Sequence, residues 1–303
     1  MNTSACSPRN ETLGLWLGVL GTFCFALTLP ATRLAMGTQA APALSFWFVT
    51  IGGAALAGVL SVAFLLTARA PWPRRTHLKP LVLALLGNAV CYPLLLGYAL
   101  RSVNAGHAAV ITALLPLATA VVAAWVLHQR ARLEFWLCAV AGSALAAAFW
   151  LLRGYVQGGS FGFAWADGLL AGAVIATAVG YIHGAQVTLA LGAVRGICWI
   201  CALALPLTLP GALLLWPAQP VPASAWGGFV YVGVVSMWAG FFVWYRALAL
   251  GGALRVSQTQ LLQPFLSIAA AALLRGEAIE PLTLILAVAV AATAMAGRSW
   301  PTR

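Results

Sequence analysis

Ten apolar stretches, each about twenty residues long, constrain the fold of this chain more than any other feature of its sequence. They cover residues 13–35, 43–66, 80–100, 107–127, 133–152, 165–190, 196–216, 225–248, 254–274 and 281–298. A helix needs about 20 apolar residues to cross the ~30 Å hydrocarbon core of a bilayer. The first stretch exceeds the apolar core of a signal peptide, so we expect it to be retained. The sequence therefore predicts an all-α integral membrane protein with ten transmembrane helices.

The composition excludes a soluble domain. Of the 303 residues, 63% are hydrophobic and only 7% are charged, whereas a soluble domain carries about 25% charged residues. The net charge of +11 is spread singly or in short groups between the apolar runs. Nucleic-acid binding requires a clustered basic face, so we expect no nucleic-acid partner. The lipid bilayer is the expected environment.

The basic residues orient the chain. With the N-terminus inside, twelve lie at inner ends of the stretches: Arg9, Arg69, Arg74, Arg75, Lys79, Arg130, Arg132, Arg195, Arg246, Arg255, Arg298 and Arg303. Four lie at outer ends: Arg33, Arg101, Arg153 and Arg275. Because cytoplasmic loops are enriched in Lys and Arg, both termini are predicted to be cytoplasmic. Abundant Arg and Ala indicate a GC-rich bacterial genome, and hence a multi-pass protein of the bacterial inner membrane.

The second half of the chain repeats the first. A shift of 148 residues lays Pro116 on Pro264 and Thr119 on Ser267. The proline match carries most weight, because proline inside a helix costs about 3 kcal/mol. Each half, 13–152 and 165–298, contains an odd number of helices, so the halves would insert with opposite topology. Inverted repeats are a common construction of secondary transporters.

Several segments, in order, resemble one known family. In the second half, Trp244-Tyr245-Arg246-Ala247-Leu248 leads through Gln263-Pro264-Phe265 to Gly276-Glu277. In the first half, Tyr98-Ala99-Leu100 leads through Leu115-Pro116-Leu117 to His128-Gln129-Arg130, after the opening Thr28-Leu29-Pro30-Ala31-Thr32-Arg33. This order resembles the EamA family of the drug/metabolite transporter superfamily, although His128-Gln129 stands where the second half has Gly-Glu. The resemblance implies two inverted five-helix repeats around a central cavity, and export of small metabolites such as amino acids or nucleobase-like compounds.

The ninth stretch is the most polar and supplies the first candidate site residues. Gln258, Gln260 and Gln263 precede Pro264. Proline lacks an N–H and clashes with the carbonyl four residues earlier, which frees a backbone acceptor. Transporters bind substrate at such helix breaks near the midplane. We expect these glutamines to line the substrate site; the alternative is that their amides bond to neighbouring helices.

Aromatic residues of the eighth stretch supply the next candidates. Trp238, Phe241, Phe242 and Tyr245 follow the spacing of one helix face. We expect Trp238, Phe241 and Tyr245 to contact substrate. The alternatives are ordinary helix packing and, for Tyr245, anchoring at the membrane interface.

Further candidates lie at polar or helix-breaking positions of other stretches: Thr28, Pro30 and Arg33 in the first, Asn88, Tyr92 and Pro93 in the third, Thr112 and Pro116 in the fourth, and His183 in the sixth. Arg33 is either a carboxylate clamp or a snorkelling side chain. His183 is either a satisfied histidine or the best candidate for a proton carrier.

No acidic residue lies in the middle of a predicted span. The five are Glu11, Glu134, Asp167, Glu277 and Glu280. A buried carboxylate is the usual cation handle of a transporter, so we expect neutral, zwitterionic or anionic substrates. Neither HExxH nor an Asp pair occurs within a helix, and Cys198-x-x-Cys201 lacks further ligands nearby, so we expect no enzyme, metal or cofactor. The alternatives are a membrane assembly or lipid-handling protein and an intramembrane enzyme.

Overall fold

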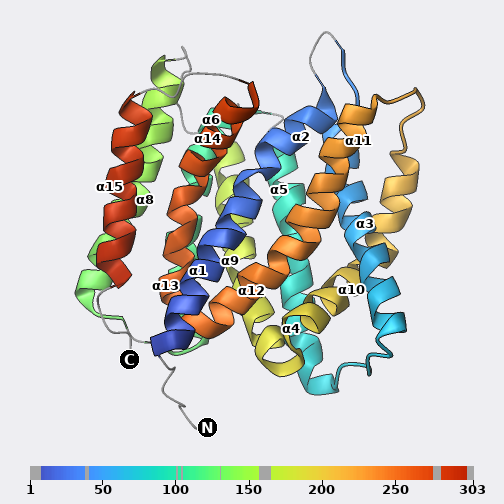
Figure 1. Ribbon diagram of the computed structural model, residues 1–303, viewed down its shortest axis with the longest axis horizontal. Helices are drawn as coiled ribbons and strands as arrows, with labels where there is room; N and C mark the ends of the chain where they lie inside the picture. The colour runs from blue at the N-terminus through green and yellow to red at the C-terminus, as the bar shows by residue number, and fades with distance from the viewer. Residues whose placement is uncertain are drawn as a thin grey trace.

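The protein is a bundle of long helices packed side by side (Figure 1). The computed structural model describes residues 8–37, 41–99, 102–103, 105–129, 131–156, 165–275 and 281–298. Within these ranges the one β pairing is the isolated bridge between Gly37 and Pro42. The prediction of an all-α protein is confirmed.

The elements of the first half follow the five predicted stretches closely. They are α1 (Pro8–Ala26), α2 (Thr28–Met36), α3 (Phe46–Thr67), α4 (Arg75–Leu85), the π-helical segment η1 (Leu86–Cys91), α5 (Tyr92–Ala99), α6 (Ala105–Thr112), α7 (Leu115–Val126) and α8 (Leu133–Val156). The first stretch is therefore divided at Leu27, the third contains a π-helical segment, and the fourth is divided at 113–114.

The second half has the same kinds of interruption. Its elements are α9 (Trp165–Leu191), α10 (Ala193–Leu214), α11 (Ala223–Val230), the π-helical segment η2 (Tyr231–Ala239), α12 (Gly240–Gly251), α13 (Ala253–Ser257), the 3₁₀ segment η3 (Gln258–Leu262), α14 (Gln263–Arg275) and α15 (Pro281–Arg298). The eighth stretch thus contains a π-helical segment and the ninth a 3₁₀ segment.

Seven helical stretches of the described chain are long and apolar enough to cross a bilayer. They are Asn10–Met36, Phe46–Thr67, Arg75–Ala99, Leu133–Leu152, Trp165–Leu191, Ala193–Leu214 and Ala223–Gly251. Val110–Val126 and Ile285–Ala296 are shorter apolar helices. Several spanning helices are thus present, while the number of ten crossings stays a prediction.

Each predicted prolyl break lies just after an irregular segment. Pro30 is the third residue of α2, and Pro93 is the second residue of α5, directly after η1. Pro116 and Pro264 are each the second residue of a helix, α7 and α14. A proline in the first turn of a helix loses no intrahelical hydrogen bond, so these positions let a new helical segment begin within each stretch.

The helices of the first half pack mainly against helices of the second. The main partners are α3 with α10, α1 with α12, α2 with α11, α8 with α15, and α9 with α4, η1 and α5. Figure 1 shows α8 and α15 at one edge of the bundle and α3 and α10 toward the other. Glycine permits the closest of these contacts, since a side chain at Gly14 would overlap the backbone of Gly251. The two halves of the chain therefore form one interleaved bundle.

Candidate functional site

A buried group of polar and aromatic side chains lies where the irregular helical segments meet α9. We call Phe25, Asn88, Tyr181, Phe241, Trp244, Tyr245 and Gln260 the central cluster. Asn88 Nδ2 donates to Tyr245 Oη at 2.7 Å, and Tyr245 Oη donates to the Gly180 carbonyl at 3.5 Å. Gln260 Nε2 donates to Tyr181 Oη at 3.3 Å. These bonds connect η1, α9, α12 and η3 in one network.

The rings of the cluster pack edge to face or tilted. The Tyr181 centroid lies 5.5 Å from that of Trp244 and 6.2 Å from that of Phe241. The Phe241 ring also lies 5.1 Å from Phe25 and 5.3 Å from Tyr245. Such arrangements suit the quadrupoles of aromatic rings. The cluster therefore combines a rigid apolar wall with amide groups.

The local sequence of α9 permits this arrangement. A Cβ at Gly180 would lie 2.5 Å from Asn88 Nδ2, and one at Gly184 would overlap the Tyr245 ring. Glycine at both positions lets the side chains from η1 and α12 rest against the α9 backbone. Tyr181 stands between these glycines.

Polar atoms of the cluster are left without partners. Asn88 Oδ1, Gln260 Oε1 and Trp244 Nε1 are buried and have no hydrogen-bond partner among the described residues. The neighbouring Gln258 Oε1 is also buried without a partner among the described residues. The Ser257 hydroxyl accepts from Gln258 Nε2 and donates its own hydrogen to the Leu254 carbonyl, so it does not donate to Gln258 Oε1. Each such buried group costs about 1–3 kcal/mol. Three acceptors and one donor are thus left unsatisfied among the described residues.

Other candidate residues lie outside the central cluster. Trp238 Nε1 donates to Ser61 Oγ on α3 at 2.9 Å, and the Trp238 ring packs on Phe242 at 4.9 Å. Thr28 Oγ1 lies 2.6 Å from Ser236 Oγ. These contacts join η2 to α3 and α2, so the structure does not bring Trp238 or Thr28 to Gln260.

The remaining candidates are dispersed. Arg33 is exposed near the end of α2, while Tyr92 and Gln263 are half-buried. Thr112 Oγ1 donates to the Ala108 carbonyl, and His183 Nδ1 donates to the Val179 carbonyl at 2.9 Å.

The interface-anchor alternative for Tyr245 is wrong, because its side chain is 1% exposed within the bundle. Tyr181, Trp244 and Phe25 belong to the central cluster but were not predicted as site residues from the sequence. The pair of glycines around Tyr181 was the available signal for a crowded contact on α9.

The described carboxylates lie in helix first turns, not in the centre of the bundle. Glu11 lies in the first turn of α1, Glu134 in that of α8 and Asp167 in that of α9. Glu277 and Glu280 lie outside the described residues. Within the described chain, no group of three His, Cys, Asp or Glu side chains is placed to hold a metal ion.

Comparison with known proteins gives consistent matches. Residues 12–152 and 164–296 each match the model of the EamA-like transporter family. An uncharacterized transporter, YdeK of Bacillus subtilis (strain 168), is 38% identical over 273 residues, which cover 88% of this chain and 91% of that protein. A solved crystal structure of a protein has the same fold, with a TM-score of 0.70 and 20% identity over 94% of this chain and 98% of that one. The family resemblance drawn from the sequence is confirmed.

Proposed function

The chain belongs to the EamA-like transporter family and is a membrane transporter, and from this premise we propose that it is a secondary transporter of small metabolites. We propose that it moves neutral, zwitterionic or anionic solutes, such as amino acids or nucleobase-like compounds, outward across the bacterial inner membrane. We also propose ten crossings in two inverted repeats, 13–152 and 165–298, around a central cavity.

Equivalent irregular segments in the two halves support the inverted repeat. η1 ends at Cys91 and η2 at Ala239, which are 148 residues apart. The same shift relates Pro116 at the start of α7 to Pro264 at the start of α14. Two further helix pairs, α3 with α10 and α8 with α15, are formed by corresponding stretches of the two halves. Such pairing is expected when a two-fold pseudosymmetry axis lies in the membrane plane.

The unpartnered polar atoms beside the aromatic wall are the observation that carries the proposal. A solute with several N–H groups would satisfy Asn88 Oδ1 and Gln260 Oε1, while Trp244 Nε1 would donate to an oxygen of the same solute. The rings of Tyr181 and Phe241, which meet edge to face, offer an apolar surface for the rest of the solute. Among the proposed substrates, this chemistry favours zwitterionic and nucleobase-like solutes over anions.

The test is transport by the purified protein in liposomes, measured against a panel of labelled amino acids and nucleobases. We expect saturable counterflow for at least one solute, with competition by its unlabelled form. Protein-free liposomes are the control. Lipid scrambling without saturable flux of any solute would contradict the proposal and support a lipid-handling protein instead.

A further inference from the structure

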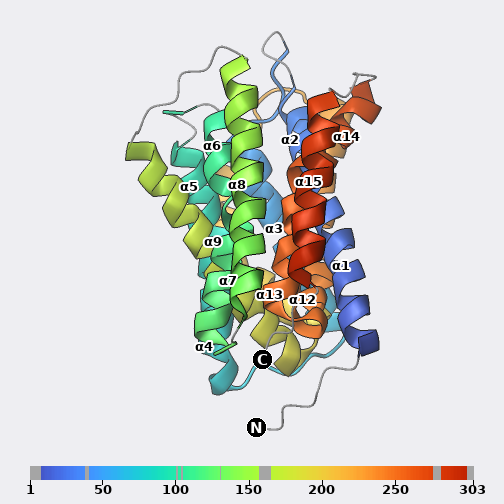
Figure 2. The same cartoon turned by 90° about the vertical axis from the view of Figure 1, so that its left-hand side faces the viewer.

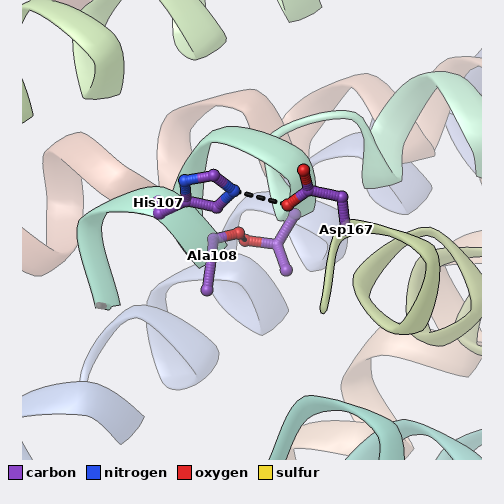
Figure 3. A network of polar contacts seen from close by, with 4 residues as sticks. His107, Ala108 and Asp167 are labelled. Atoms are coloured by element: carbon purple, nitrogen blue, oxygen red, sulfur yellow. Dashed lines mark hydrogen bonds and ion pairs between the residues drawn. The ribbon is translucent and has the colours of Figure 1, made fainter. Parts of the chain in front are cut away.

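Two ion pairs lie at opposite ends of the bundle. His107 Nε2 lies 2.5 Å from Asp167 Oδ1. This contact, drawn as a dashed line in Figure 3, joins α6 to α9. Arg255 Nη1 lies 2.7 Å from Glu11 Oε2 and joins α13 to α1. Figure 2 shows α6 at one end of the molecule and α13 at the other. The basic-residue distribution predicts the α6 end to be outside and the α13 end to be inside.

The cations of the two pairs occupy equivalent positions of the repeat, and their carboxylates occupy similar ones. His107 and Arg255 are 148 residues apart, which is the shift that relates the prolines and the π-helical segments. Asp167 and Glu11 both lie in the first turn of the first helix of their halves. Each pair therefore connects the first helix of one half to the fourth helix of the other.

The pairs are only partly accessible. The side chains of His107 and Asp167 are 12% and 16% exposed, and those of Arg255 and Glu11 are 15% and 38% exposed. Partial burial reduces the screening that weakens ion pairs at an open surface. Each pair is thus placed to hold its end of the bundle together.

We propose that the two pairs are the latches of the outer and inner gates, and that only the outer latch responds to pH. The proposal rests on the proposed transport function, in which the two ends open in turn. The cation of the inner latch is an arginine, which stays protonated at all physiological pH values. The cation of the outer latch is a histidine, whose charge changes between about pH 5 and 8.

Among the described contacts, Asp167 is a charged side chain that the structure places against His107. The elements packed against α6 are α8 and α9. At the α6 end of the bundle, the described part of α8 carries one other titratable side chain, Tyr155. The helix α5, which packs on α9, carries Tyr98 at this end. Both are uncharged near neutral pH. The side chains of Arg101 and Arg153 lie outside the described residues.

The direction of the pH effect follows from these charges. The protonated imidazole attracts the Asp167 carboxylate and favours the closed outer end, while the neutral imidazole attracts it less. External acid therefore keeps the outer gate closed, while the inner gate does not respond.

The test measures the distance between spin labels across the outer gate, in lipid nanodiscs and with the native cysteines replaced. Ser102 precedes α6 and Gly168 lies in α9, and both are exposed positions for the labels. A Cβ at Gly168 would meet no neighbouring atom within 4 Å. We expect the ratio of long to short distances to rise at least about threefold from pH 5.5 to pH 8, the effect of an ion pair of ordinary strength. Equal distributions at the two pH values would overturn the proposal.

Three substitutions test whether His107 causes the pH response. His107→Arg copies the inner latch, so the short distance should prevail at both pH values. His107→Gln should remove the pH dependence, and a full pH response in this variant would overturn the proposal. His128→Asn, at the other end, is the control and should keep the wild-type response; asparagine tolerates the positive φ of 52° there. Because the readout is a distance, failure of the latch is distinguishable from absence of transport.

Discussion

Two residues of the central cluster differ in how fully their polar atoms are hydrogen-bonded. Gln260 has a buried carbonyl oxygen without a described partner, whereas the Tyr245 hydroxyl both accepts and donates hydrogen bonds. A group that the protein leaves unsatisfied is available to a solute, while a fully bonded group holds the structure in place. The two residues should therefore differ in what their substitution affects.

Gln260→Leu should weaken substrate binding with little effect on stability. The change removes the free carbonyl oxygen and one long hydrogen bond at similar side-chain size. We expect the binding free energy of the solute identified in liposomes to fall by about 1–2 kcal/mol, the scale of one hydrogen bond, with the melting temperature nearly unchanged. Gln258→Leu is the matched control with a smaller expected loss, because the Gln258 amide bonds to the adjacent Ser257, whereas that of Gln260 bonds to Tyr181 of the central cluster. Normal binding by Gln260→Leu together with failure of Gln258→Leu would show that the wrong side of η3 was assigned.

Tyr245→Phe should reduce stability. The change removes the acceptor of Asn88 Nδ2 and leaves that amide buried without a partner. We expect unfolding in a denaturing detergent to require about 1–3 kcal/mol less free energy. Tyr155→Phe, at a side chain that is 77% exposed, should change stability by less than about 0.5 kcal/mol. An unchanged stability of Tyr245→Phe would mean that the Asn88–Tyr245 bond does not hold η1 to α12.

The sequence indicated part of the central cluster and missed part of it for a physical reason. The polar ninth stretch pointed to Gln260, and the mid-depth asparagine of the third pointed to Asn88. The single face predicted for Trp238, Phe241 and Tyr245 assumed 3.6 residues per turn. Trp238 lies in the π-helical segment η2 and Phe241 in α12, so the phase changes between them. Trp238 consequently contacts α3 while Phe241 reaches α9.

At the scale of elements, the ends of the ten stretches lie within a few residues of the ends of the described helices. The length of an apolar run can be read directly from the sequence. The prolines indicated where helices would be interrupted. The π-helical and 3₁₀ segments were not predictable, since their stability depends on the helices that pack against them. The tight contact of η1 with α9 is the clearest case.

Gly87→Ala should disrupt this contact. A Cβ at Gly87 would lie 2.8 Å from Gly180 Cα and would overlap the Ala176 carbonyl oxygen. Because the neighbouring atoms are backbone, the helices must separate, which should cost about 1–3 kcal/mol of unfolding free energy. The matched control is Gly168→Ala, where the new Cβ meets no atom within 4 Å. This control should gain roughly 0.5–1 kcal/mol from the better helix propensity of alanine. Equal stability of the two variants would contradict the tight η1–α9 packing.

At the scale of the whole molecule, both ends of the chain should be cytoplasmic. α1 begins and α15 ends at the same end of the bundle in both views (Figures 1 and 2), and the basic residues favour that end. A reporter that is active only in the periplasm should therefore be inactive when fused after Arg303. The same reporter inserted in the outer loop between α8 and α9 should be active. Strong activity after Arg303 would overturn the orientation.

The pairing of α1 with α12 has a consequence for how the protein is made. The ribosome completes α12 about 225 residues after α1, and at 5–20 residues per second this takes roughly 10–45 s. During that interval, the glycine-lined face of α1 at Gly14, Gly18 and Gly21 has none of its final partners from α12 and η3. Insertion into the membrane and assembly of the bundle are therefore separate events, and the nascent first helix must be held by lipid or by the insertion machinery until the last third of the chain emerges.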